Sequence, residues 1–295
     1  NSIKNLFDRR SVRTHRDRSA IKFCDHNYLF HEIAGRLCEK LDDINRKFEF
    51  GLDLGCHSGE TSKLLSVKHQ ATNWVRTDMS FQLSKIASKK TGAPVLVMDE
   101  EFIAFKKHSF DIVISNLSLH WANDLPGTLA QISKVLKPDG VILISLFGQQ
   151  TLHELKMCLS RAEIEEENGL SPRVSAFSTI QDLGNLLIRA GFALPVADVE
   201  KITVYYPHAM KLMRDLRAMG ESNSANLRRK SFSRKTTMMR TSQLYQEKFE
   251  NEANQVPATF DVITLTGWSP DISQPKPLKP GSGQVNLNNF LNAKK

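Results

Sequence analysis

Apolar residues recur along this chain with two different spacings, which predict a regular alternation of strands and helices. Short apolar runs have the length and continuity of buried strands, and between them apolar positions recur every three or four residues, as on one face of a helix. The expected strands are Phe48–Leu54, Asn73–Thr77, Val95–Met98, Phe110–Asn116, Val141–Phe147, Ala197–Tyr206 and Phe260–Gly267. The expected helices are Asn27–Asp43, Glu60–Val67, Phe81–Lys89, Leu125–Leu136, Leu152–Glu167, Ile180–Ala190, Ala209–Met219 and Met238–Glu250.

Strands that alternate with helices of this length predict right-handed βαβ units, and therefore an α/β fold with a parallel sheet. Residues 1–46 are expected to form a basic segment followed by one helix. The main α/β domain is expected over residues 47–268, with helical insertions at about 148–180 and 208–250. Residues 269–295 begin with many Pro, Ser and Gly residues and are expected to form an extended tail.

Composition and charge narrow the classes of partner. The apolar runs are all shorter than the ~20 residues that a membrane-spanning helix needs. The net charge of +8 comes most visibly from two clusters, Arg9–Arg18 and Arg228–Lys235. Solvated helix faces explain such clusters, and so do acidic protein partners or peripheral contact with anionic lipid. No nucleic-acid-binding motif is present, and the four scattered cysteines favour neither a zinc site nor a disulfide framework.

The turn that follows the first expected strand carries the strongest chemical signal. Asp53, Gly55, Cys56 and Gly59 fall in this turn, directly before a helix. Glycines there let the backbone turn tightly and approach a ligand closely. A dinucleotide site favours G-x-G-x-x-G, whereas this turn is D-x-G-x-x-x-G with His57 inside it, which fits an S-adenosylmethionine site better.

Acids at the ends of the next strands extend this candidate site. Asp78 ends the second strand and is expected to accept the ribose hydroxyls, whereas Asp53 would lie near the cofactor's amino group. Asp99 follows the third strand and is expected to accept from the adenine amino group, with Met79 and Phe102 against the ring. Each acid alone could simply cap a helix. Three in order at successive strand ends favour a cofactor site, to which Glu100 and Asn116 are added as candidates.

Further motifs at Phe110–Asn116, His120–Trp121 and Leu136–Gly140 complete a pattern that resembles the class I S-adenosylmethionine-dependent methyltransferases. The pattern is D-x-G-C-x-x-G, F-D-x-V-x-S-N, H-W and L-K-P-D-G, over about residues 48–147. The resemblance implies a Rossmann-like, mostly parallel sheet of seven strands, flanked by helices, with an N-terminal helix and a helical lid. It also implies S-adenosyl-L-methionine as the cofactor.

The second half of the chain resembles two related families. His153–Leu155, Asp182–Leu183 and Ala190–Phe192 resemble both the malonyl-acyl-carrier-protein O-methyltransferases of biotin synthesis and the methyltransferase-like assembly factors of respiratory complex I. Met219–Asn223 and Pro257–Trp268 are closer to the assembly factors. That resemblance implies a protein substrate in complex I and, in the mitochondrial branch, arginine hydroxylation. The expected location is the cytoplasm in a bacterium or the mitochondrial matrix, beside the inner membrane, in a eukaryote.

Catalytic candidates follow the fourth strand. Asn116, His120 and Trp121 are expected on the substrate side, with His120 as a base near neutral pH and Trp121 as a wall. Tyr205, Tyr206 and Glu221–Asn223, from the second half of the chain, are expected to line the same site. Structural packing explains all of these residues equally well. The histidines are scattered along the chain, so neither an iron site nor another metal is expected. Methylation or hydroxylation of a complex I protein, methylation of malonyl-acyl carrier protein, and a non-catalytic assembly role all remain open.

Overall fold

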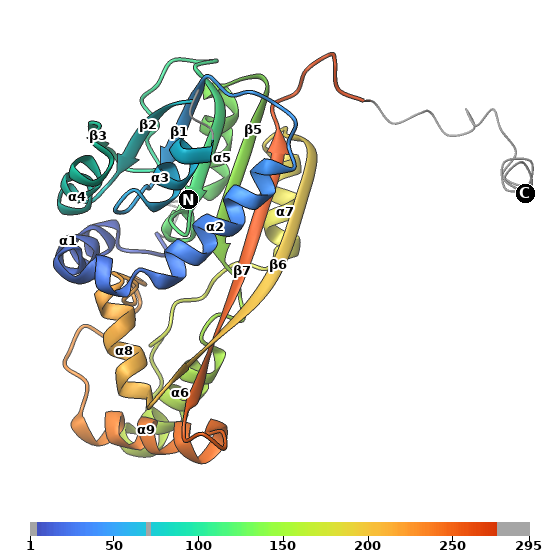
Figure 1. Ribbon diagram of the computed structural model, residues 1–295. Helices are drawn as coiled ribbons and strands as arrows, with labels where there is room; N and C mark the ends of the chain where they lie inside the picture. The colour runs from blue at the N-terminus through green and yellow to red at the C-terminus, as the bar shows by residue number, and fades with distance from the viewer. Residues whose placement is uncertain (1–4, 69–71, 276–295) are drawn as a thin grey trace, which may run out of the picture.

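The structure, a computed structural model, describes residues 5–68 and 72–275 and contains a seven-stranded sheet in these ranges. The strand order is β3-β2-β1-β4-β5-β7-β6 (Figure 1). The first five strands pair in parallel, and β7 pairs antiparallel with both β5 and β6. The strands are β1 Phe50–Leu54, β2 Asn73–Asp78, β3 Val95–Val97, β4 Phe110–Asn116, β5 Leu136–Phe147, β6 Ala193–Tyr206 and β7 Val256–Trp268.

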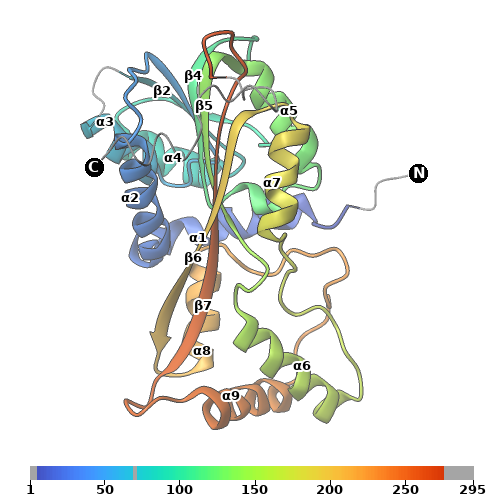
Figure 2. The same cartoon turned by 90° about the vertical axis from the view of Figure 1, so that its right-hand side faces the viewer.

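Helices cover both faces of this sheet, and a third group lies beyond one end of it (Figure 2). Buried side chains of α2, α3 and α4 share one apolar cluster, and those of α5 and α7 share another with the opposite face. The helices are α1 Arg9–His26, α2 Tyr28–Asp42, α3 Glu60–Lys68, α4 Phe81–Thr91, α5 Leu125–Val135, α6 His153–Glu167, α7 Ile180–Arg189, α8 Ala209–Ala218 and α9 Lys235–Phe249, with the 3-10 turn η1 Leu119–Trp121. The expected Rossmann-like class I methyltransferase sheet is therefore confirmed.

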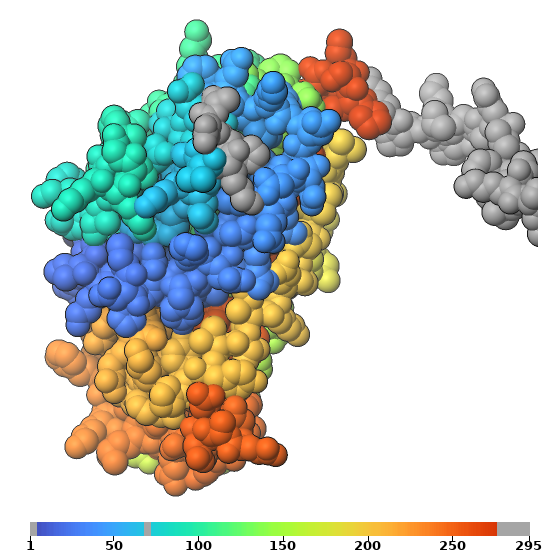
Figure 3. Space-filling model, viewed as in Figure 1, coloured from blue at the N-terminus to red at the C-terminus, as the bar shows by residue number. Residues whose placement is uncertain are grey.

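The N-terminal helix α1 is an element that the apolar spacing did not predict. Asp8 caps its first turn, because the carboxylate accepts from the backbone N–H of Ser11 at 3.1 Å. Charged residues interrupt its apolar face, and one of them, Arg16, is buried. Figure 3 shows α1 (dark blue) as a band across this face of the molecule, between the region of α3 and α4 (cyan to teal) and the third helix group (yellow to orange).

The last two strands are longer than the sequence predicted, with β6 and β7 each beginning four residues earlier. Pro257 obscured the start of β7, because proline lacks the N–H that a central strand needs. At that position β7 pairs only with β6, since its pairing with β5 begins at Val262. The extra residues of β7 pair with the end of β6 and carry β7 down toward α9 (Figure 2), whereas the extra residues of β6 pair with the other end of β7.

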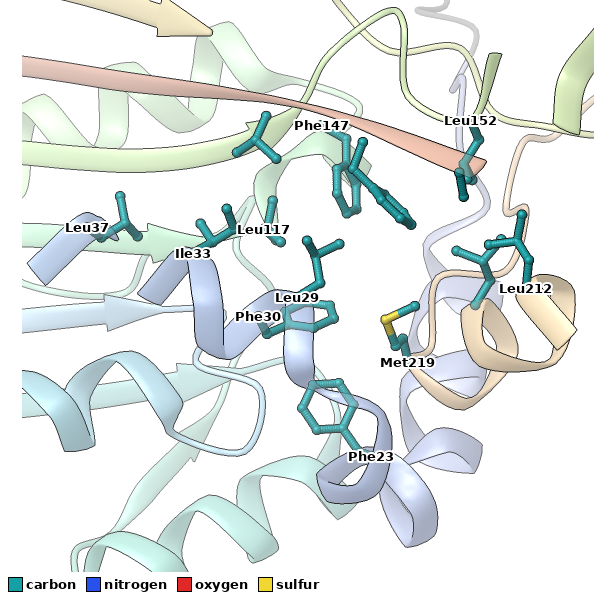
Figure 4. Packing of buried hydrophobic residues seen from close by; sticks show 14 of the residues in the cluster. Phe23, Leu29, Phe30, Ile33, Leu37, Leu117, Phe147, Leu152, Leu212 and Met219 are labelled. Atoms are coloured by element: carbon teal, nitrogen blue, oxygen red, sulfur yellow. The ribbon is translucent and has the colours of Figure 1, made fainter. Parts of the chain in front are cut away.

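One apolar cluster runs from the sheet into the third helix group. It includes Ile33 and Leu37 on α2, Phe147 at the end of β5 and Leu212 on α8 (Figure 4). The helices α6, α8 and α9 therefore share a core with the sheet. Most of the tail predicted for residues 269–295 lies outside the described residues.

Candidate active site

The strand order reverses between β1 and β4, and ligands of open α/β sheets bind in the crevice at such a reversal. The turn after β1 lies there. Gly55 has a φ of +72°, in the left-handed region that glycine adopts without steric cost. A Cβ atom added to Gly55 would lie 2.1 Å from Oγ of Ser118, so a larger residue does not fit.

His57 also has a left-handed backbone, with a φ of +50°, which is unusual for a residue with a side chain. Its backbone N–H donates to Oδ2 of Asp78 at 3.0 Å. Its buried ring stacks on Phe23, with the centroids 5.8 Å apart, and meets Phe30 edge-on. The departure from a glycine-only turn is thus held in place by packing from α1 and α2.

Asp53 meets the requirement for a cationic ligand group. The residue is 1% exposed, and neither carboxylate oxygen has a hydrogen-bond partner of regular geometry among the described residues. Burial raises the pKa of Asp53 to about 6, although Ser62 and Arg76 act in the opposite direction. An ammonium group placed here would supply the missing partner, so the site fits the amino group of S-adenosylmethionine.

The other predicted carboxylates are paired with two arginines of α1. Arg16, which is 1% exposed, donates from Nη1 to Oε1 of Glu100 at 2.6 Å and lies 3.6 Å from Oδ2 of Asp78. Arg9 pairs with Asp99 at 2.5 Å and also with Glu100. Despite the opposing effect of burial, these arginines lower the pKa of Glu100. Arginine side chains of α1 therefore partner the acids that the sequence assigns to ribose and adenine.

Part of the N-terminal basic cluster is therefore not a solvated helix face. Arg9 and Arg16 lie seven residues apart, about two helical turns, so both point to the same side of α1. The sequence contained this signal, but an arginine within a basic run is usually exposed. Asp17 adds a third contact, because Oδ1 accepts from Oγ of Ser80 at 2.6 Å.

Two of the catalytic candidates after β4 meet a residue from the second half of the chain. Nε2 of His120 lies 3.1 Å from Oε2 of Glu221, and Nε1 of Trp121 donates to the same oxygen at 2.9 Å. Oε1 of Glu221 and Nδ1 of His120 have no partner among the described residues. Burial tends to raise the pKa of Glu221, but His120 and Arg16 outweigh it and hold that pKa below its usual value. Glu221 is thus a carboxylate at neutral pH with one oxygen free.

Asn116 is placed differently. Its Nδ2 donates to the backbone oxygen of Phe30 at 2.8 Å, and its Oδ1 accepts from Ser145 at 2.9 Å. Both ends of the amide therefore tie β4 to α2 and β5. Its predicted part in catalysis and cofactor binding stays a prediction.

A pocket of about 1060 Å³ adjoins this region. Its aromatic lining comes from Trp121, Phe147, Phe177 and Phe260, and Glu221 lies in its wall. The remaining lining comes from α1, α6, α8, the start of α9, residues 151–152 and the segments 172–177 and 221–233. The pocket is large enough for an amino-acid side chain with part of its peptide backbone.

The other sequence candidates lie away from the pocket. Met79 packs with Phe7, Val12 and Trp121, and Cys56 is a buried thiol in the turn after β1. Tyr205 and Tyr206 are not among the pocket residues, and Tyr206 bonds instead to Tyr28. Among the described residues no three His, Cys, Asp or Glu side chains gather as metal ligands would, and no helix is long and apolar enough to cross a membrane.

Comparison with known proteins places the chain among methyltransferase-fold proteins. Residues 52–144 match the family described as methyltransferase domain. The chain is 41% identical to "Arginine-hydroxylase NDUFAF5, mitochondrial" from Danio rerio, over 96% of this chain and 88% of that protein. It is 32% identical to a malonyl-[acyl-carrier protein] O-methyltransferase from Methylovorus, over 93% of this chain and 94% of that protein.

A solved structure supports the fold. The phosphoethanolamine N-methyltransferase 2 of Haemonchus contortus, in complex with S-adenosyl-L-methionine, superposes with a TM-score of 0.50 at 16% identity. The superposition covers 80% of this chain and 53% of that one. With the identity to the curated relatives, it shows that the chain belongs to the family of the arginine hydroxylases named NDUFAF5, built on the class I methyltransferase fold.

Proposed function

We propose that this chain is an enzyme of respiratory complex I assembly that binds S-adenosylmethionine and modifies an arginine side chain of a complex I protein. The observation that carries the proposal is Glu221 in the pocket wall. Its side chain is 5% exposed and ionised, and one oxygen lacks a partner. A guanidinium group can donate two parallel N–H bonds to such a carboxylate, and aromatic faces such as Trp121 attract its positive charge.

The cofactor would be held at the strand ends. Asp53 would accept from its amino group, and the turn at Gly55 leaves room for its methionine part. Asp78 and Asp99 would accept from ribose and adenine once Arg16 and Arg9 exchange partners. When bound, S-adenosylmethionine supplies an electrophilic methyl group.

The mass of complex I subunits tests this function. Complex I is isolated from cells that lack the chain and from the same cells that express it again, and arginine-containing peptides are compared by mass spectrometry. We expect one peptide to gain mass only when the chain is present. An added oxygen atom identifies hydroxylation, as in the relatives' name, and an added methylene identifies methylation. Identical masses in both preparations would overturn the enzymatic function and leave a non-catalytic assembly role.

Methylation of malonyl-acyl carrier protein has one supporting observation, the basic lining of the pocket. Eight Arg and Lys residues line it beside only two carboxylates, and such a lining attracts an acidic carrier protein. The acceptor of that reaction is itself a carboxylate, however. Glu221 would repel it inside a poorly solvated wall. The same carboxylate favours the arginine substrate, so we prefer the first proposal.

We also propose that the loop after α8 makes peripheral contact with anionic lipid at the matrix face of the inner membrane, in a eukaryotic source. Phe232 and Leu227 are 98% and 85% exposed. Lys230, Arg234 and Lys235 are exposed beside them. Apolar side chains next to cations are typical of segments that rest at a membrane surface.

Sedimentation with vesicles tests this contact. With vesicles that contain anionic lipid, Phe232→Ser is expected to lower the bound fraction several-fold. Ile272→Ser is the control, because Ile272 is 92% exposed but lies outside this basic loop. Equal losses in the two variants, or equal binding to neutral vesicles, would contradict the proposal.

A further inference from the structure

The charges around the pocket are arranged in two zones. Glu221, withdrawn from solvent, lies among the aromatic side chains of the wall. Four pocket residues, by contrast, are exposed cations, two on α1 and two on α8. They are Arg18, Lys22, Arg214 and Arg217. The pocket thus combines an anionic wall at Glu221 with a group of four exposed cations, which we call the mouth.

The mouth cations are not neutralised by the protein itself. Among the described residues, none of the four has an ion-pair partner. Other pocket cations differ in this respect, since Arg173 and Arg229 pair with Glu163, and Arg228 pairs with Asp8. The positive potential at the mouth is therefore left for a ligand to balance.

The helices α1 and α8 place these cations together. Arg18 and Lys22 are four residues apart, and Arg214 and Arg217 are three apart, so each pair lies on one face of its helix. In Figure 1, helix α8 lies directly below helix α1. Because the two helices pack against each other, their four exposed cations lie close together in the lining of the pocket.

We propose that the pocket selects an arginine whose sequence neighbours are acidic. This inference rests on the proposed function, since it takes arginine as the group that reaches Glu221. The mouth attracts Asp or Glu beside the target and repels Lys or Arg, and the wall accepts the single guanidinium. Such charge complementarity sets specificity and the rate of encounter more than contact area does.

Peptide binding to the full chain tests the inference. Fluorescent peptides carry one central arginine flanked by Asp, by Asn or by Lys, and affinities are measured by anisotropy at low and high salt. The Asp-flanked peptide is expected to bind about tenfold more tightly than the Asn-flanked one at low salt, and the Lys-flanked one more weakly. The advantage is expected to shrink at high salt.

Two charge-reversal variants locate the effect. Arg214→Glu with Arg217→Glu is expected to abolish or invert the preference for Asp flanks. Lys106→Glu with Lys107→Glu changes the net charge equally, at exposed residues outside the pocket, and is expected to leave the preference intact. Equal affinities for the three flanks, or equal effects of both variants, would overturn the inference.

A fourth peptide separates this inference from the proposed function. It keeps the Asp flanks and replaces the central arginine with glutamine. Weaker binding of this peptide supports arginine as the target group. Binding as tight as that of the arginine peptide would overturn the proposed substrate, whereas the comparison of flanks would still report on the mouth.

Discussion

Asp53→Asn is expected to weaken S-adenosylmethionine binding by about 50-fold and, at the same time, to make the ligand-free protein more stable at neutral pH. The affinity for the cofactor falls because the amide cannot form the charged hydrogen bond to the ligand's ammonium group. The stability rises because the variant no longer has to bury a charged carboxylate. The pKa of Asp53 is about 6 in the folded protein, above its value of about 3.9 in an unfolded chain.

The direction of the pKa shift determines the pH range over which the stability of the variant differs from that of the wild type. A carboxylate whose pKa is raised by folding contributes its full stability below about pH 4 and loses it as the pH rises through about 6. The variant should therefore match the wild type near pH 4 and exceed it by up to about 3 kcal/mol above pH 7. Calorimetric titration and denaturant unfolding across this range measure both effects.

Asp111→Asn is the matched control. Asp111 lies at the opposite end of a strand and pairs with Lys137 at 2.9 Å, and its hydrogen bonds lower its pKa despite partial burial. The Asp111 carboxylate therefore stabilises the folded protein at pH values above its unfolded pKa. The Asp111→Asn variant should lose stability at neutral pH but keep its affinity for the cofactor. Unchanged cofactor affinity in Asp53→Asn would show that Asp53 does not hold the cofactor.

Glu221→Gln is expected to lower kcat/KM for an arginine substrate by about 100-fold, because the neutral amide no longer balances the guanidinium charge in a poorly solvated wall. Cofactor affinity should change little. The product is measured by mass spectrometry on the peptide or subunit identified above.

A citrulline peptide distinguishes binding from a merely structural role. Citrulline keeps the shape of arginine without its charge, so wild type and Glu221→Gln should bind it with similar affinity. Parallel losses for the arginine and citrulline peptides would assign Glu221 to holding His120 and Trp121 in place. Glu200→Gln, at a half-exposed ion pair with Arg36, serves as the control variant.

The strands and their terminal acids were predictable because each gives a local signal. A buried strand is a short apolar run, and Asp53 and Asp78 stand where such runs end. The helix α1 was not predictable in this way, because Arg16 occupies a buried position where an apolar residue is expected. Its ion partners, Asp78 and Glu100, lie more than 60 residues away and enter only through the fold.

The pairing of His120 with Glu221 is a second feature that could not be predicted from the sequence. The two residues are 101 positions apart and come from different layers of the molecule. Local spacing singled out His120 and Trp121 as a pair and included Glu221 only as a residue near the substrate. Neither periodicity nor spacing reports a contact between segments so distant along the chain.

Helix α1 lies between the strand-end acids and the pocket. Arg16 faces the strand-end acids, while His15 and Ser19, its near neighbours on the helix, line the pocket. A ligand that draws Arg16 from Asp78 therefore acts on the same helix that lines the pocket. Thermodynamic reciprocity then applies. If bound cofactor changes the affinity for the peptide by some factor, bound peptide must change the affinity for the cofactor by the same factor.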